Sequence, residues 1–134
     1  MATERQKLDK QCLVLFSLCV RTKQKKCRAC GQDDSLQAHH IVQRTYKLSR
    51  YRTDNGVCLC KGCHFVEKND AERFRNMIIS IIGEEDYATR QNKYRVQHKW
   101  TIAELRQIKA DLQAELKRLE SDWGDLDPEG EPPF

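Results

Sequence analysis

The chain has 134 residues, a length that suits one compact domain, and its 24 Lys and Arg against 20 Asp and Glu give a formal net charge of +4. Hydrophobic residues make up 39% of the chain, too many for a wholly disordered protein, and the lack of an apolar run of about 18 residues excludes a membrane span. Since the first residues form no signal-peptide pattern, we expect a cytoplasmic protein whose seven cysteines bind metal or pack in the core.

Residues 1–26 are expected to form an N-terminal helix and a basic lead-in. Between residues 4 and 21, apolar side chains recur every three or four residues, which is the spacing of one helix face. Cys12 and Cys19 lie on this apolar stripe. We predict that both are core residues, because a free cysteine packs as a small hydrophobe.

Residues 27–69 are predicted to form a small core around two Cys-x-x-Cys turns. The four cysteines are Cys27, Cys30, Cys60 and Cys63. Each turn aims two thiolates at one point, and two such turns complete a tetrahedral site for a structural Zn2+. Cys58 is a rival ligand, although its spacing to Cys63 does not suit the tight turn.

Two short strands are expected between the cysteine pairs, at residues 36–41 and 55–59, joined by a polar loop over residues 43–54. Adjacent residues on a strand point to opposite sides. One of the neighbours His39 and His40 can therefore reach a metal while the other approaches a substrate from a different direction.

Residues 70–120 are predicted to be helical. The first helix covers 70–82 and ends at Gly83, a shorter one covers 84–94, and a capping box at Thr101 opens a third that runs to about residue 120. The apolar stripe of this third helix packs either on the 70–82 helix of the same chain or on a second subunit. Residues 121–134 are acidic and contain three prolines, so we expect a flexible tail.

Basic charge is concentrated in residues 1–100, which hold 20 Lys and Arg against 11 Asp and Glu. Two basic clusters flank the candidate site, and a cationic face of this kind suits a phosphate backbone. The sequence therefore predicts DNA as the partner. The candidate phosphate contacts are Lys25, Lys26, Arg28, Arg44, Lys47, Arg50 and Arg52.

The order C-x-x-C, L-Q-A-H-H-I, D-N-G-V and C-K-G-C-H resembles the HNH, or ββα-metal, nucleases over residues 27 to about 67. The resemblance implies an α+β fold, with a small ββα-metal core stapled by the four-cysteine zinc site and flanked by N-terminal and C-terminal helices. It implies that His40 is the general base and that Asn55 orients the catalytic loop and the His40 ring. His39 and His64 would hold a catalytic divalent cation, Mg2+ or Mn2+, with Ni2+ and Zn2+ also suited to nitrogen ligands.

A narrower resemblance, to the NinG (Rap) recombination endonucleases of phage lambda, covers roughly residues 12–119. It is carried by H-K-W-T-I-A-E at residues 98–104 with the leucine-rich helix that follows, by I-S-I-I-G-E-E at 79–85, and by residues 50–55. The resemblance implies phage recombination and nicking of branched DNA, such as Holliday junctions and D-loops. The chain departs from that family in having His39 and His64 where Gly and Asn are common, which bears on the preferred metal.

Taken together, these patterns predict a metal-dependent DNA endonuclease that hydrolyses phosphodiester bonds. One alternative is a non-catalytic zinc module that only binds nucleic acid, and another is an HNH nuclease of homing or restriction type. We also expect a homodimer, because a four-way junction has near two-fold symmetry and its resolution needs two opposed nicks.

Overall fold

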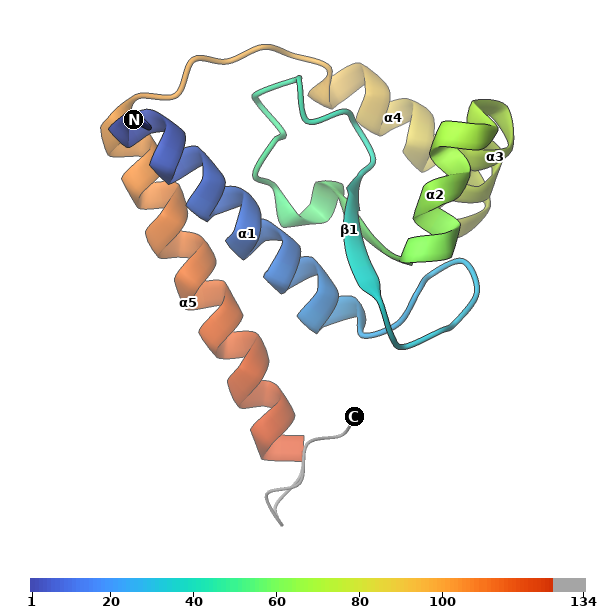
Figure 1. Ribbon diagram of the computed structural model, residues 1–134. Coiled ribbons are helices and arrows are strands. Elements are labelled where there is room, and N and C mark those ends of the chain that lie inside the picture. Colours follow the sequence, from blue (N-terminus) through green and yellow to red (C-terminus); the bar gives the residue numbers. More distant parts are fainter. Residues whose placement is uncertain (127–134) are drawn as a thin grey trace.

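An α+β arrangement of helices around one small sheet is seen in a computed structural model, which describes residues 1–126 and side chains as far as residue 121 (Figure 1). The elements in chain order are α1 (Glu4–Gln24), β1 (Leu36–His40), the 3-10 helix η1 (Thr53–Asn55), β2 (Gly56–Cys60), α2 (Lys61–Asn69), α3 (Ala71–Ile82), α4 (Glu84–Tyr94) and α5 (Ile102–Leu126). The α+β class is therefore confirmed for the described residues. None of the helices in this part of the chain has the length and hydropathy needed to cross a membrane.

The first and last helices lie side by side and run in the same direction (Figure 1). The Cys12 thiol lies 3.6 Å from the Leu105 carbonyl, and the Cys19 thiol lies 3.5 Å from the Leu112 carbonyl, one heptad further along both helices. Cys12 and Cys19 are buried, and burial raises the pKa of each thiol to about 11. Their prediction as core residues is confirmed.

The apolar stripe of α5 packs on α1, in a cluster that also holds Tyr51. The partner expected for this stripe was α3 or a second subunit. Nothing in the sequence indicated α1 as the partner, because the residues of α1 and α5 that meet are about ninety positions apart. A homodimer would have to use another surface, and it stays a prediction. The helix also continues to Leu126, so residues 121–126 are helical where a flexible tail was expected; residues 127–134 lie outside the described part.

Strands β1 and β2 pair antiparallel, with Ala38 opposite Cys58 and His40 opposite Gly56. One face of this sheet packs on Phe16 and Val20 of α1. A side chain at Gly56 would overlap Val20, so only glycine allows α1 to lie this close to the sheet. Strand β1 ends one residue before its predicted end, and β2 is shifted by one residue, because Asn55 belongs to η1 and β2 runs to Cys60.

The other face of the sheet is covered by α2 and α3, where Val57 and Leu59 pack with Phe74 and Ile78. Helices α3 and α4 have the predicted bounds to within one residue. Gly83 separates them with a φ of 94°, a conformation that favours glycine. The ββα resemblance implied a helix after the second strand but no bounds for it, and the second cysteine turn proves to be the first turn of α2.

Candidate metal centres and the cleft between them

The first candidate centre is the predicted set of four cysteines, Cys27, Cys30, Cys60 and Cys63, whose sulfur atoms all lie within 4.8 Å of one another. The Cys30 and Cys60 sulfurs are 3.7 Å apart. Around a tetrahedral Zn2+ with bonds of about 2.3 Å, two sulfurs are separated by about 3.8 Å. The residues present therefore fit a structural zinc ion.

Backbone amides donate hydrogen bonds to two of these sulfurs and so favour the thiolate form that binds a cation. The Cys30 amide donates to the Cys27 sulfur at 3.5 Å, and the Cys63 amide donates to the Cys60 sulfur at 3.4 Å. Burial raises the pKa of the Cys27 thiol, but backbone amides of Cys60, Cys30 and Ala29 outweigh burial and lower it to about 6. Burial and the neighbouring thiols raise the pKa of Cys63. Four thiolates in such proximity therefore need a cation to coexist.

Cys58, the rival ligand, lies on the opposite side of the sheet. It is fully buried against Phe16 and Val20 and is not part of the cysteine cluster. Burial raises the pKa of its thiol to about 11. The residue packs as part of the core.

The second candidate centre joins the two predicted ligands, His39 on β1 and His64 on α2. The His39 Nδ1 and His64 Nε2 atoms are 3.3 Å apart, close to the separation of about 3.4 Å that two nitrogens take around a tetrahedral ion at about 2.1 Å. Gln37, on the same face of β1, accepts a hydrogen bond of 2.7 Å from His64 Nδ1. This bond leaves the His64 Nε2 lone pair free for a cation, as second-shell partners of metal ligands commonly do.

Both rings are held in the neutral form that binds metal. Burial, with smaller contributions from the neighbouring His64 and His40, lowers the pKa of His39 to about 3. Burial also lowers the pKa of His64, although the Glu67 carboxylate acts in the opposite direction. Neutral imidazole is therefore the form that both residues present at neutral pH.

Glu67 is a third candidate ligand that the sequence analysis missed. Its carboxylate oxygens lie 3.9 Å from His39 Nδ1 and 3.9 Å from His64 Nε2, and the three donor groups lie within 4.8 Å of one another. The available signal was the spacing of His64 and Glu67, because residues three apart share one face of a helix. Two imidazoles and one carboxylate form a donor set that fits a transition-metal ion and leaves positions for other ligands.

His40 points to the other side of β1, as predicted for one of the two neighbouring histidines. Its ring stacks on Phe16 with centroids 4.3 Å apart. Its Nε2 atom lies 2.9 Å from the Arg50 carbonyl, and since a carbonyl can only accept, Nε2 carries the proton and Nδ1 is the free base. Burial lowers the pKa of His40, although its bond to Arg50 acts in the opposite direction, so the ring is neutral at neutral pH.

Asn55 is completely buried and ties down the loop that follows β1. Its side-chain oxygen accepts from the Val42 amide at 2.8 Å, and its amide donates to the Val42 carbonyl at 3.0 Å. It also donates to the Ser49 carbonyl at 3.4 Å, next to Arg50. Asn55 thus orders the loop that carries the hydrogen-bond acceptor of His40, and it bonds to the loop, not to the His40 ring.

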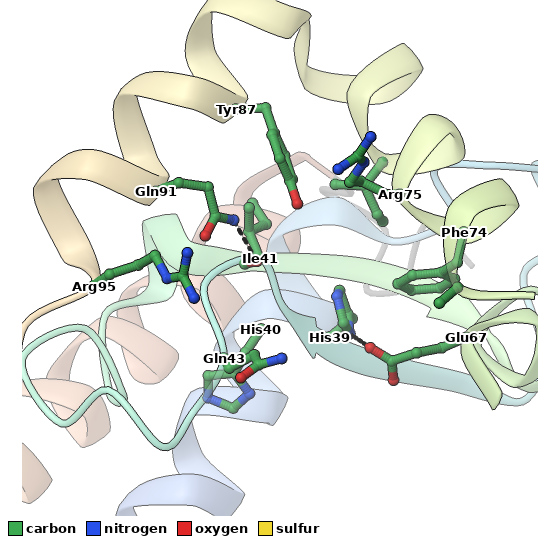
Figure 2. Close-up of a pocket in the computed structure, with 12 residues that line it drawn as sticks. His39, His40, Ile41, Gln43, Glu67, Phe74, Arg75, Tyr87, Gln91 and Arg95 are labelled. Carbon is green, nitrogen blue, oxygen red and sulfur yellow. Dashed lines mark hydrogen bonds and ion pairs between the residues drawn. The ribbon is translucent and has the colours of Figure 1, made fainter.

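Two hollows of about 280 Å3 each meet at the second centre, and His39, His40, Gln43 and Glu67 line both. The lining of the first hollow also includes Arg44 and His64. The second extends to α3 and α4, where Arg75, Tyr87, Gln91 and Arg95 line it (Figure 2). These four residues were not among the predicted site residues, because they become neighbours of the histidines only through the packing of α3 and α4.

A family model described as Bacteriophage Lambda NinG protein matches residues 2–122. The chain belongs to the NinG family. Searches of curated proteins and of solved structures found no significant match. The part of the chain that matches the NinG family contains both candidate metal centres and both hollows.

The seven predicted phosphate contacts of this NinG-family chain divide into two groups. Arg50 is 12% exposed and makes a two-pronged ion pair with Asp9, at 2.8 and 2.9 Å. Arg52 pairs in the same way with Asp54, at 2.8 and 3.0 Å. Each of these two guanidinium groups pairs with an acid of its own chain, so a DNA phosphate would have to compete with that carboxylate; both residues stay predicted phosphate contacts. Arg52 is exposed despite this pair, and so are the other five: Lys25, Lys26, Arg28, Arg44 and Lys47.

Proposed function

We propose that this chain is a metal-dependent endonuclease of the HNH, or ββα-metal, type that hydrolyses phosphodiester bonds in DNA. Membership of the phage NinG family supports a role in recombination. Branched DNA as the substrate and the host cytoplasm as the site of action are part of the proposal. The local order of β1, β2 and α2 around the second centre agrees with a ββα-metal core.

The observation that carries the proposal is the placement of a free base beside a candidate metal centre. His39, His64 and Glu67 converge on one side of β1, while the unprotonated Nδ1 of His40 belongs to the other side of the same strand. His39 and His40 line the same two hollows. A phosphate held between them would meet a metal on one side and a base on the other.

In this mechanism, His40 Nδ1 accepts a proton from the attacking water. The Arg50 carbonyl accepts the hydrogen bond of His40 Nε2–H, stabilises the imidazolium that forms, and fixes the tautomer. Stacking on Phe16 holds the ring plane. The divalent cation, when bound by His39, His64 and Glu67, would supply charge stabilisation at the phosphate and the leaving oxygen.

The test is a cleavage assay of His40→Ala on duplex, single-stranded and four-way-junction DNA with Mg2+ or Mn2+. A general base contributes roughly 10²–10⁴-fold, so we expect a loss of that size in rate, with unchanged zinc content and a retained cooperative unfolding transition. The matched control is His98→Ala, which removes an exposed histidine outside both hollows and should keep wild-type cleavage.

The cysteine cluster favours a second candidate function, a zinc-stabilised module that binds nucleic acid without cutting it. The same assay separates the two functions. A wild-type protein that binds DNA but cleaves none of the three substrates with either metal would support the binding module and contradict the nuclease.

A further inference from the structure

The second hollow reaches beyond the residues that the proposed chemistry needs. Its inner part is apolar, formed by the buried side chains of Ile41, Phe74 and Ile78. Its rim is polar: Tyr87, Gln91 and Arg95 approach from α4 and its C-cap, and His39 lies on the facing side (Figure 2). An apolar interior with a polar rim is the usual character of a small-molecule or nucleobase site.

The rim offers hydrogen-bonding groups that the fold does not consume. The Gln91 amide donates to the Ile41 carbonyl at 3.3 Å (Figure 2), which fixes the side chain, and its oxygen has no hydrogen-bond partner among the described residues. Tyr87 is half-buried, and its hydroxyl has no hydrogen-bond partner among the described residues. A planar base with donors and acceptors on its edge suits these groups.

Two arginines at the rim supply positive charge. Arg75 makes no ion pair within the described part of the chain. Arg95 lies over the Tyr46 ring, with its guanidinium carbon 5.1 Å from the centroid, and donates to the Tyr46 hydroxyl at 3.1 Å. Tyr46 therefore holds Arg95 in place while its remaining N–H groups stay available. The one acid of the hollow is Glu67, the candidate metal ligand.

We propose that this hollow accepts one unpaired nucleobase of the strand that is cut, next to the scissile phosphate, while Arg75 and Arg95 bind the phosphates that flank it. This inference rests on the proposed nuclease function. In an intact duplex, base faces are covered by stacking and edges by pairing, so a buried apolar interior is of use only to a base that has left the stack. A phosphate backbone alone would need the arginines but not the apolar interior.

The experiment compares two DNAs that differ only in one unpaired residue, a plain duplex and the same duplex with a single bulged 2-aminopurine. Binding to zinc-loaded full-length protein is measured without added divalent metal, so no cleavage is required. We expect roughly tenfold tighter binding of the bulged DNA, a factor at the lower end of what one stacked base contributes. A change in 2-aminopurine fluorescence should accompany binding.

Three variants assign this preference to the hollow. Ala71→Phe adds a ring at an exposed lining residue in the first turn of α3, and should reduce the affinity ratio of bulged to plain DNA to near one. Arg75→Gln should lower the slope of log affinity against log salt by about one unit. Arg73→Gln, two residues away on the same helix and outside the hollow, should leave both the ratio and the slope unchanged.

Equal wild-type affinity for the two DNAs, with no fluorescence change, would overturn the inference, as would a folded Ala71→Phe protein that keeps the preference. If Ala71→Phe fails to fold, the wild-type ratio and fluorescence still decide. Tight binding of bulged DNA by a protein that cleaves no DNA would support the nucleobase site and contradict the proposed nuclease function. A protein that cleaves DNA but binds bulged and plain DNA equally would contradict the nucleobase site and leave the nuclease function standing.

Discussion

The two candidate metal centres contain ligands from neighbouring strands and the same helix, yet they differ in ligand number and in openness. The cysteine centre takes all four ligands from the chain, and backbone amides donate to its sulfurs. The histidine centre takes three ligands and opens into a hollow on each side. Closed four-ligand sites are structural, whereas catalytic sites keep a position for water or substrate. Under the proposed function, the first centre serves folding and the second would serve the chemistry.

The largest expected effect is the loss of the cysteine centre. Cys60 begins α2 and ends β2, so Cys60→Ser should release the metal and unfold or aggregate the domain. Structural zinc contributes on the order of 10 kcal/mol to folding. The measurement is thermal unfolding together with zinc content. Cys58→Ala is the control, because it removes a buried cysteine that is not a ligand, and it should retain zinc and a cooperative transition. A Cys60→Ser protein with wild-type melting and zinc would contradict the assignment.

The histidine centre should respond in the opposite way, with loss of metal binding and little loss of stability. Glu67 is 49% exposed and supports no core packing. Glu67→Ala should weaken binding of Mn2+ or Co2+ at least tenfold, since even a supporting partner of a metal ligand is worth roughly 10–100-fold. Metal titration and thermal unfolding of the zinc-loaded protein measure the two quantities. An unchanged titration would remove Glu67 from the ligand set.

How much of this could be read from the sequence depends on how local each signal is. Within each turn the two cysteines are three residues apart, so spacing alone predicted that the structure would bring the four sulfurs together. The alternation along β1 similarly predicted that His39 and His40 would point to opposite sides. Glu67 was equally local to His64, but the spacing of one glutamate and one histidine on a helix does not single out a metal ligand until His39 is placed beside them from another element.

Ion pairs and helix packing between distant segments could not be predicted. Arg50 was read as a phosphate contact because it lies in a basic cluster, but its partner Asp9 lies forty-one residues earlier, on α1. The packing of α5 on α1 likewise joins the two ends of the chain. Periodicity shows which face of a helix is apolar, but not which helix covers it.

The ion pair of Asp9 offers a smaller effect that links α1 to the loop after β1. Burial raises the pKa of Asp9, but hydrogen bonds from Arg50 and Tyr51 outweigh it, and the net pKa lies below the ordinary value of 3.8. A carboxyl whose pKa is lowered in the folded state adds stability above its unfolded pKa, and this stability is lost as pH falls through the folded pKa. Asp9→Asn should therefore cost about 1–3 kcal/mol at pH 7, and less in acid.

Urea unfolding of Asp9→Asn and wild type at pH 7 and near pH 3 measures this difference. Asp54→Asn is the matched control, since its partner Arg52 is 50% exposed, and an exposed pair is worth about 1 kcal/mol or less. Asp9 binds the guanidinium of Arg50, and the backbone carbonyl of Arg50 accepts the hydrogen bond of His40. Asp9→Asn should therefore loosen the His40 ring and slow cleavage a few-fold. A stability difference that is the same at both pH values would contradict the lowered pKa of Asp9.

The smallest expected effect concerns the exposed basic residues. It separates basic side chains that pair with acids of the chain from those that bind DNA phosphates. If about four of the five candidates other than Arg50 and Arg52 touch phosphates, log affinity for DNA should fall with log salt at a slope of roughly −4. Arg44→Gln should reduce this slope by about one unit for any DNA sequence, because Arg44 is exposed beside the histidine centre. Arg52→Gln should leave the slope unchanged, since Asp54 already neutralises that guanidinium. Equal slopes for the wild type and the Arg44 variant would show that the strand does not pass this side of the histidine centre, and an affinity independent of salt would contradict DNA binding as a whole.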